Sequence, residues 1–118
     1  MILIFSHSRF RINRPSIQKS GEVVLKQKGR KETEVVHIVF VGVRKMREIA
    51  YKYKKEKKAY PVLSFSYLND EVQKNLIGEI IICYPQAVLL AAEREKPVDR
   101  VIMQLVEHGI MSVIKNER

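Results

Sequence analysis

The chain has few of the residues that give small proteins covalent or metal-based stability. Cys83 is the only cysteine among 118 residues, so an intrachain disulfide is impossible and a zinc knuckle built from several thiolates is excluded. Because it lies in the apolar stretch EIIICYP, this cysteine is predicted to be a small core residue. A glycine-rich loop that cradles phosphate is absent too, so no phosphate-loop enzyme is indicated.

Long apolar runs are also missing. No stretch approaches the roughly 20 apolar residues that a membrane span requires. The opening MILIF is too short, and too soon followed by basic residues, to be a secretory signal. We therefore expect a cytoplasmic protein that does not enter a membrane. A length of 118 residues, 46% of them hydrophobic and 30% charged, predicts one folded domain over residues 1–118.

Acidic residues are scarce relative to basic ones. The chain has 22 Lys and Arg against 13 Asp and Glu, which gives a formal net charge of +9 and a pI near 9.8. A polyanion is the expected partner. RNA or DNA fits better than an anionic membrane surface, because no long basic amphipathic anchor is evident. Excess lysine also serves solubility alone in many proteins, so that alternative stays open.

The first half of the chain is predicted to alternate strands and helices. Strands are expected at residues 1–5 and 34–42, where apolar, β-branched and aromatic residues gather. A helix is expected over residues 15–28, with Pro15 near its first turn. A second helix is expected over residues 43–58, where apolar residues recur at helical spacing among lysines and arginines.

The second half is predicted to contain a β-hairpin and two helices. Strands at residues 61–68 and 76–84 flank a loop at 69–75, so we expect them to pair antiparallel. Helices follow at residues 85–95 and 97–115, each beginning with a proline. The predicted fold is α+β, a mixed sheet of about four strands covered by helices, in the order β-α-β-α-β-β-α-α.

The predicted helix over residues 43–58 and its end carry the densest charge of the chain. Phosphates attract such clustered cations, and the interleaved Tyr51, Tyr53 and Tyr60 offer faces on which unpaired bases can stack. The alternative is a solvated helix face whose tyrosines lie partly in the core. The candidate RNA-binding residues are Arg44, Arg47, Lys52, Lys54, Lys55, Lys57 and Lys58.

Metal chemistry would need about three converging protein ligands with one position open for water. The chain has three histidines, His7, His37 and His108, and only His108 is expected on the inward-looking part of a late helix. The residue one turn later is Ser112, where a helical ligand pair would have His or Glu. Two carboxylates, Glu79 and Glu107, could act as ligands, but their spacing in the sequence matches no characteristic zinc-binding motif. The residues by themselves therefore do not favour a standard zinc site.

Three motifs in succession resemble the YbeY family of rRNA maturation factors. They are VLSF (residues 62–65), GEIII (residues 78–82) and HG (residues 108–109), within a similarity that covers about residues 36–114. The resemblance implies a mixed sheet with surrounding helices and a zinc ion held by three signature histidines. It also implies single-strand-specific endoribonuclease activity in 16S rRNA processing, with RNA, the small ribosomal subunit or both as partners.

The resemblance weakens at the positions that carry the family's chemistry. Its signature begins at His108, but Ser112 and Arg118 occupy the positions of the other two histidine ligands. Lys54 stands at the family's arginine and would act in catalysis, although it lacks bidentate phosphate recognition. The usual C-terminal end of the family is expected to be missing. Zinc is thus implied by the resemblance and opposed by the residues present.

Three functions remain in competition. The first is a YbeY-like, ribosome-associated RNA-binding protein in rRNA maturation with a degraded metal site. The second is an active metal-dependent endoribonuclease in which Glu107 or Glu117 replaces lost ligands and Lys54 stabilises the developing charge. The third is a protein-interaction module without enzymatic activity. The oligomeric state is not predicted.

Overall fold

The computed structural model describes residues 1–68 and 75–115, so most of the predicted loop at 69–75 lies outside the described residues. Eight elements follow in the predicted order, and the α+β class with a mixed four-stranded sheet is confirmed. The first four are β1 (Ile2–Phe5), α1 (Arg14–Gln27), β2 (Val35–Val41) and α2 (Val43–Lys54). The last four are β3 (Val62–Ser66), β4 (Leu76–Cys83), α3 (Tyr84–Arg94) and α4 (Val98–Lys115).

The sheet has three parallel strands and one antiparallel strand. The strand order is β1-β2-β4-β3, in which β1, β2 and β4 are parallel while β3 pairs antiparallel with β4. The predicted hairpin pairing is therefore confirmed. Helix α1 is the crossover between the parallel neighbours β1 and β2. Helix α2 leads from β2 to β3, which lies beyond β4 at the edge of the sheet.

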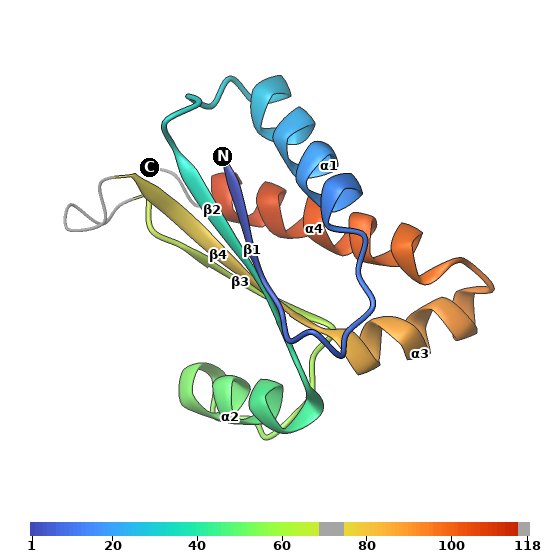
Figure 1. Ribbon diagram of the computed structural model, residues 1–118. Coiled ribbons are helices and arrows are strands. Elements are labelled where there is room, and N and C mark those ends of the chain that lie inside the picture. The colour runs from blue at the N-terminus through green and yellow to red at the C-terminus, as the bar shows by residue number, and fades with distance from the viewer. Residues whose placement is uncertain (69–74, 116–118) are drawn as a thin grey trace.

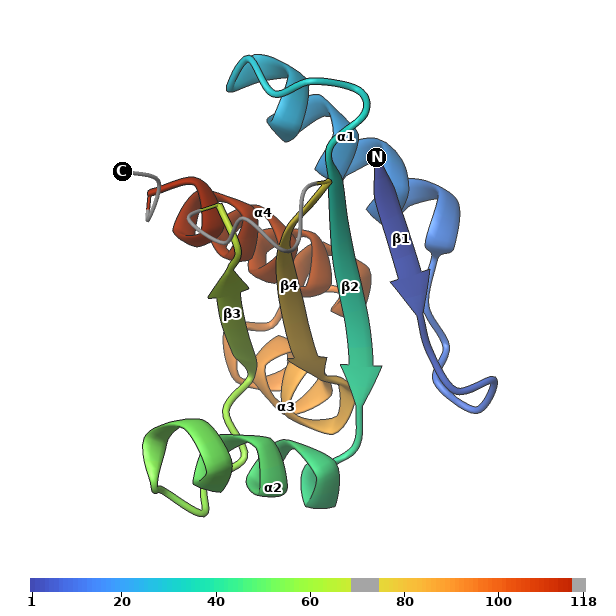
Figure 2. The same ribbon diagram turned by 90° about the vertical axis from the view of Figure 1, so that its left-hand side faces the viewer.

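The chain leaves all three parallel strands at one edge, which we call the carboxyl edge of the sheet. The β1–α1 loop (residues 6–13) follows β1 there, α2 follows β2, and α3 begins directly after β4. Figures 1 and 2 show these segments at the end of the molecule toward which the arrows of β1, β2 and β4 point. Residues far apart in the sequence thus share this edge.

The core has two parts, one on each face of the sheet. The larger part joins one face to α1, α3 and α4 and has Ile38, Ile80 and Ile82 near its centre. The smaller part joins the other face to α2 through Met46 and Ala50, both fully buried. Figure 1 shows the same division, with α1, α3 and α4 on one side of the sheet and α2 on the other. In the described ranges, no helix is long and apolar enough to cross a bilayer.

Helix α4 packs very closely against β4. A Cβ atom added at Gly109 would lie 2.7 Å from Cγ2 of Ile80, and one added at Gly78 would lie 2.6 Å from both methyl groups of Val113. Real Cβ atoms do not approach this closely, so the two glycines permit a spacing that no other residue type allows. The contact fixes the position of α4 above the sheet, and with it the side chains next to Gly109.

Helix α2 ends four residues earlier than its predicted end at residue 58. It stops at Lys54, and Lys55 takes the left-handed conformation with φ 58°, its N–H donating to the carbonyl of Tyr51. Like charges three and four residues apart destabilise a helix. The lysines from residue 52 onward stand at these spacings. The repulsion between their charges would increase if the helix continued to residue 58, and this favours an earlier end.

Candidate functional site

A cavity of about 300 Å³ lies along the outer edge of β3, bounded by the end of α2 and by α4. This volume is at the small end of the range for ligand pockets. One wall is the edge strand itself, and the others come from two helices of opposite sheet faces. The lining residues are Tyr53, Lys54, Val62, Leu63, Ser64, Phe65, His108 and Ser112.

His108 and Ser112 enter the cavity from α4. Residues four apart lie on one face of a helix, so the two side chains stand one above the other. His108 is exposed, which corrects the prediction that it looks inward. The physical reason is its place beside the buried stripe of α4: Gly109 and Ile110 turn toward the sheet, whereas His108 falls at the margin of that stripe.

Lysines and tyrosines at the end of α2 form one surface, which we call the lysine–tyrosine patch. The Nζ atoms of Lys54 and Lys58 lie 4.8 and 4.9 Å from the ring centroid of Tyr60. Contacts of this kind are worth about 0.5–1 kcal/mol at exposed sites, enough to bias where the ammonium groups lie. The members of the patch are Tyr51, Lys52, Tyr53, Lys54, Lys55, Lys57, Lys58 and Tyr60.

The tyrosines are more exposed than a core role would require. Tyr51 and Tyr53 are 50% and 59% exposed, and Tyr53 rests against Phe65 with ring centroids 4.8 Å apart. Lys55 and Lys57 lie over the ring of Tyr51. The predicted alternative, tyrosines partly within the core, therefore describes Tyr60 only, which packs against the smaller core cluster.

Tyr60 is also held by a carboxylate. Its hydroxyl donates a hydrogen bond to Glu56, and this bond, together with partial burial and the negative charge of Glu56, raises the pKa of the Tyr60 phenol. The phenol thus stays protonated at neutral pH. The ring itself is uncharged and suited to stacking, and the ammonium groups of Lys54 and Lys58 beside it oppose the negative charge of Glu56.

The two arginines at the start of α2 stand apart from the patch. Arg44 and Arg47 are exposed and belong to the first turns of the helix, whereas the patch lies at its last turn. At about 3.6 residues per turn, Arg47 lies about one turn and Arg44 about two turns before Tyr51. The structure therefore brings together the predicted lysines at residues 52–58 and leaves the two predicted arginines nearer β2.

The predicted carboxylates do not point into the cavity. Glu107 lies against α1, where its Oε1 atom is 3.5 Å from the Ser20 hydroxyl. Glu79 is on β4, where Tyr67 donates a 2.7 Å hydrogen bond to it and His37 Nδ1 lies 4.0 Å away. Glu107 is thus wrongly predicted as a replacement ligand beside His108, and Glu117 lies outside the described residues.

Cys83 is a core residue, as predicted. It is fully buried in the smaller core cluster beneath α2. Burial raises the pKa of its thiol, and a backbone hydrogen bond at Gln86 and the positive charge of Arg47 offset this only in part. A protonated thiol is a poor metal ligand, so Cys83 adds nothing to metal binding.

The donor set near His108 does not fit zinc. Over residues 1–68 and 75–115, no three His, Cys, Asp or Glu side chains come close enough together to hold a metal ion. The three histidines lie on the β1–α1 loop, on β2 and on α4. Serine is a weak zinc ligand, and the predicted third position, Arg118, lies outside the described residues. The described side chains thus leave zinc with one strong ligand.

Comparison with known families shows to which family the chain belongs. A sequence model described as Endoribonuclease YbeY matches residues 5–114. The chain belongs to the YbeY family. Endoribonuclease YbeY of Finegoldia magna is 30% identical over 99 residues, which cover 83% of this chain and 65% of that protein. Endoribonuclease YbeY of Acinetobacter baumannii is 26% identical over 115 residues, covering 93% of this chain and 73% of that protein.

A solved structure shows the same fold at low sequence identity. The solution structure of a Thermotoga maritima protein matches with a TM-score of 0.67 and 18% identity, over 96% of this chain and 71% of that one. The chain spans about half to two thirds of the first curated YbeY relatives, for example 51% of the protein from Thermodesulfovibrio yellowstonii.

Three residues that the YbeY resemblance assigned to one site, Lys54, His108 and Ser112, line the same cavity. The sequence did not indicate Tyr53 or Phe65 as their neighbours. Phe65 was recognised only as part of the VLSF motif. The signal that could have revealed it is the alternation of side chains along a strand, which places Phe65 on the same face of β3 as Leu63, the face covered by α2.

Proposed function

We propose that this YbeY family member binds unpaired RNA, in particular rRNA, through the lysine–tyrosine patch and the adjoining cavity, with a degraded metal site. The observation that carries the proposal is the convergence of five lysines and three exposed or partly exposed tyrosines beside the β3 cavity. Ammonium groups attract phosphates irrespective of sequence, and each tyrosine ring offers a stacking face for a base.

The geometry favours single strands over a duplex. The patch and cavity lie together at the end of α2, and a cavity of about 300 Å³ has room for one base or a few small groups but not for stacked base pairs. Stacking needs unpaired bases, because paired bases are covered on both faces. Support also comes from the family, whose name denotes an endoribonuclease and therefore a protein that acts on RNA.

The proposal includes loss of the zinc centre. Lys54 and His108 would contact RNA as a cation and a hydrogen-bonding ring, without a metal between them. The one-histidine donor set of the described residues supports this view, because zinc binding energy comes from several ligands that share the cation. The expected setting is the small ribosomal subunit in the cytoplasm, with residues 1–118 acting as one domain.

Replacing four lysines tests the proposal. Lys54→Ala, Lys55→Ala, Lys57→Ala and Lys58→Ala combined should weaken binding of single-stranded RNA at least tenfold and about equally for all sequences, because phosphate contacts carry no sequence information. Fluorescence anisotropy with labelled oligonucleotides at fixed salt measures the change. The matched control is the set Lys19→Ala, Lys26→Ala, Lys28→Ala and Lys31→Ala, which removes the same charge from α1 and the loop after it.

The two variants separate a binding site from general charge. If the proposal holds, only the first variant loses affinity. Equal losses would mean that net charge alone attracts the RNA, and unchanged binding in both would exclude this patch as the site. Unchanged binding in both variants would favour the protein-interaction module, because the lysines would then serve solubility.

An active metal-dependent endoribonuclease is the second candidate. Family membership favours it, as does the placement of Lys54 and His108 in one cavity. Any metal would have to be completed by residues beyond the described set or by the RNA itself. Metal content distinguishes the two candidates, since a nuclease of this class needs a bound ion to activate water.

A further inference from the structure

We infer that the β1–α1 loop forms a second RNA-contacting patch, in which Arg9 and Arg11 bind phosphates of a strand that extends beyond the lysine–tyrosine patch. The inference rests on the proposed function and goes beyond it, because it assigns a separate site on a different segment. Its ligand is the phosphodiester backbone of single-stranded RNA.

The topology of the sheet places this loop near α2. The loop follows β1 and α2 follows β2, and since these strands are parallel both segments lie at the carboxyl edge. Figure 2 shows the loop and α2 at the same end of the molecule. Arg44 and Arg47 lie in the first turns of α2, which follows β2, the strand next to β1, while the lysine–tyrosine patch lies at the other end of α2. The loop packs on the larger core through Phe10 and Ile12, so an RNA strand that reaches both patches passes around this edge from one face of the sheet to the other. Cations therefore follow the carboxyl edge from the loop to the patch.

The loop is held in one shape by contacts with its surroundings. The Phe10 ring stacks on Tyr84 with centroids 5.0 Å apart and an interplanar angle of 22°. The Tyr84 hydroxyl donates a 3.0 Å hydrogen bond to the carbonyl of Arg11, and the Asn13 side chain caps α1 by accepting from the N–H of Ser16. A loop already held in its binding shape loses less entropy when a ligand binds.

The two arginines themselves are available. Arg9 and Arg11 are exposed, and within the described residues neither forms an ion pair. The guanidinium of Arg9 lies 5.5 Å from the Phe10 ring centroid, which holds the side chain above the loop. Arg14 differs, because its guanidinium donates to the carbonyl of Ile4 and so holds β1 and α1 together. Arg9 and Arg11 are therefore the cations that a phosphate can reach.

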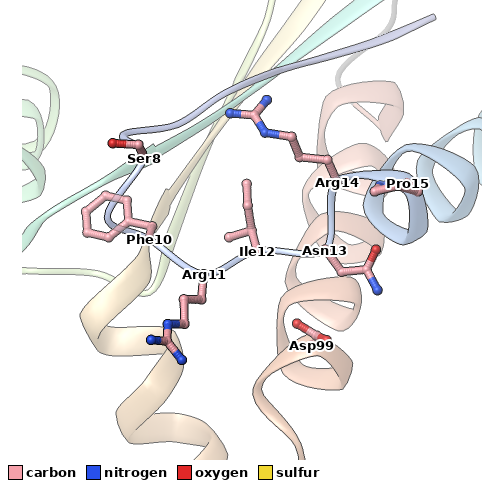
Figure 3. Close-up of a pocket in the computed structure, with 8 residues that line it drawn as sticks. All are labelled: Ser8, Phe10, Arg11, Ile12, Asn13, Arg14, Pro15 and Asp99. Carbon is pink, nitrogen blue, oxygen red and sulfur yellow. The ribbon is translucent and has the colours of Figure 1, made fainter.

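A depression beside the loop adds room for a nucleotide. It has a volume of about 640 Å³ and is lined by loop residues, by Arg14 and Pro15 at the start of α1 and by Asp99 of α4. Figure 3 shows the guanidinium groups of Arg11 and Arg14 on opposite sides of Ile12, with Asp99 at the margin of the depression. The carboxylate of Asp99 repels phosphate but accepts hydrogen bonds from a ribose hydroxyl or base amino group. The sugar and base would thus occupy the depression while the phosphates remain on the arginines.

RNA length separates the two patches. We would measure binding of single-stranded RNA of about 5 and about 15 nucleotides, a range that spans the site sizes of single-strand binders. The variant Arg9→Ala with Arg11→Ala should bind the longer strand several-fold more weakly and the shorter strand as well as the unmodified protein does. For the longer strand, the slope of log affinity against log salt should become shallower by about 1.4, at roughly 0.7 per phosphate contact.

Two controls keep the test independent of folding and net charge. Lys26→Ala with Lys28→Ala removes the same charge near the end of α1, at the opposite edge of the sheet, and should change neither affinity. Arg9→Lys with Arg11→Lys keeps the charge and should retain most of the binding. Circular dichroism melting should be unchanged, because neither arginine side chain forms a hydrogen bond among the described residues.

Several results would overturn the inference. An equal loss for both RNA lengths, an equal loss in the lysine control, or no loss at all would each exclude a separate patch on the loop. In the last case the proposed function stands if the four-lysine variant at the end of α2 still loses affinity, and an acidic protein becomes the better ligand for the loop. If the unmodified protein binds neither RNA, both proposals fail together.

Discussion

At the scale of single residues, His108 decides what chemistry the cavity supports. It is exposed at the margin of α4 and is the only histidine in the lining of the cavity. An imidazole on its own binds zinc weakly, but it donates and accepts hydrogen bonds and stacks on bases. His108 would act as a zinc ligand only with a second strong ligand one helical turn away, and Ser112 occupies that position. The cavity is therefore better suited to hydrogen bonding and stacking.

The purified protein should therefore contain much less than one zinc ion per chain, and His108→Ala should not change that content. Ser112→His is the matched variant, because it creates a histidine pair at i and i+4 on one helix face and should increase zinc uptake. Inductively coupled plasma mass spectrometry after dialysis measures all three proteins. Stoichiometric zinc that disappears in His108→Ala would contradict the proposed loss of the metal centre.

The sequence predicts which site residues lie together when they belong to one helix. The i, i+4 relation of His108 and Ser112 can be read from the sequence, as can the lysines around residue 55. Arg9 and Arg11 lie between the predicted strand at residues 1–5 and the predicted helix at 15–28, where the sequence by itself indicates no binding residue. Their position near α2 depends on the parallel pairing of β1 and β2, which no local pattern specifies.

At the scale of elements, the distance between α4 and β4 positions the cavity. Gly109 contacts Ile80 of β4, and this contact fixes the position of the neighbouring His108 at the cavity. A glycine in a helix interior costs about 1 kcal/mol relative to alanine, so its presence in α4 needs a reason. The reason is the 2.7 Å that would separate a Cβ atom from Ile80, a fully buried side chain with little room to move.

Gly109→Ala should lower the free energy of unfolding by about 1–3 kcal/mol, the usual range for overpacking a core. Chemical denaturation followed by circular dichroism measures the loss. Gly42→Ala is the control without a clash, because no atom lies within 4 Å of its Cβ position; the loss there should be only about 0.5–1 kcal/mol, since alanine is a poorer N-cap residue than glycine. A stabilised Gly109→Ala variant would mean that helix propensity outweighs the clash and that α4 can move away from β4.

The order of elements could be predicted in full from the sequence, because each strand and helix has its own periodicity. The order of strands in the sheet could not, except for the antiparallel pairing of the predicted hairpin. After α2 the chain could form a strand next to β2 or one at the edge beyond β4. It forms the edge strand β3, and this choice depends on packing across the whole sheet. The end of α2 was also missed, because repulsion among lysines competes there with helical periodicity.

At the scale of the whole molecule, the net charge of +9 includes the five lysines of the lysine–tyrosine patch and the two arginines of the β1–α1 loop, which make up the proposed RNA path. The affinity of the unmodified protein for single-stranded RNA should fall steeply with salt. Five phosphate contacts at the lysine–tyrosine patch would give a log–log slope of about −3.5, at roughly 0.7 per contact. Titrations at several potassium chloride concentrations measure it. A slope near zero would assign the charge to solubility and exclude both RNA proposals.

The position of β3 at the edge of the sheet has one more consequence. The N–H of Tyr67 donates to Ile77 and the N–H of Cys83 donates to Pro61, so the odd-numbered residues of β3 exchange hydrogen bonds with β4. Backbone groups alternate along an antiparallel strand, so Val62 and Ser64 turn their amides and carbonyls toward the cavity. Part of the recognition surface is then main chain, which alanine scanning does not remove, so residual affinity in side-chain variants would come from the strand itself.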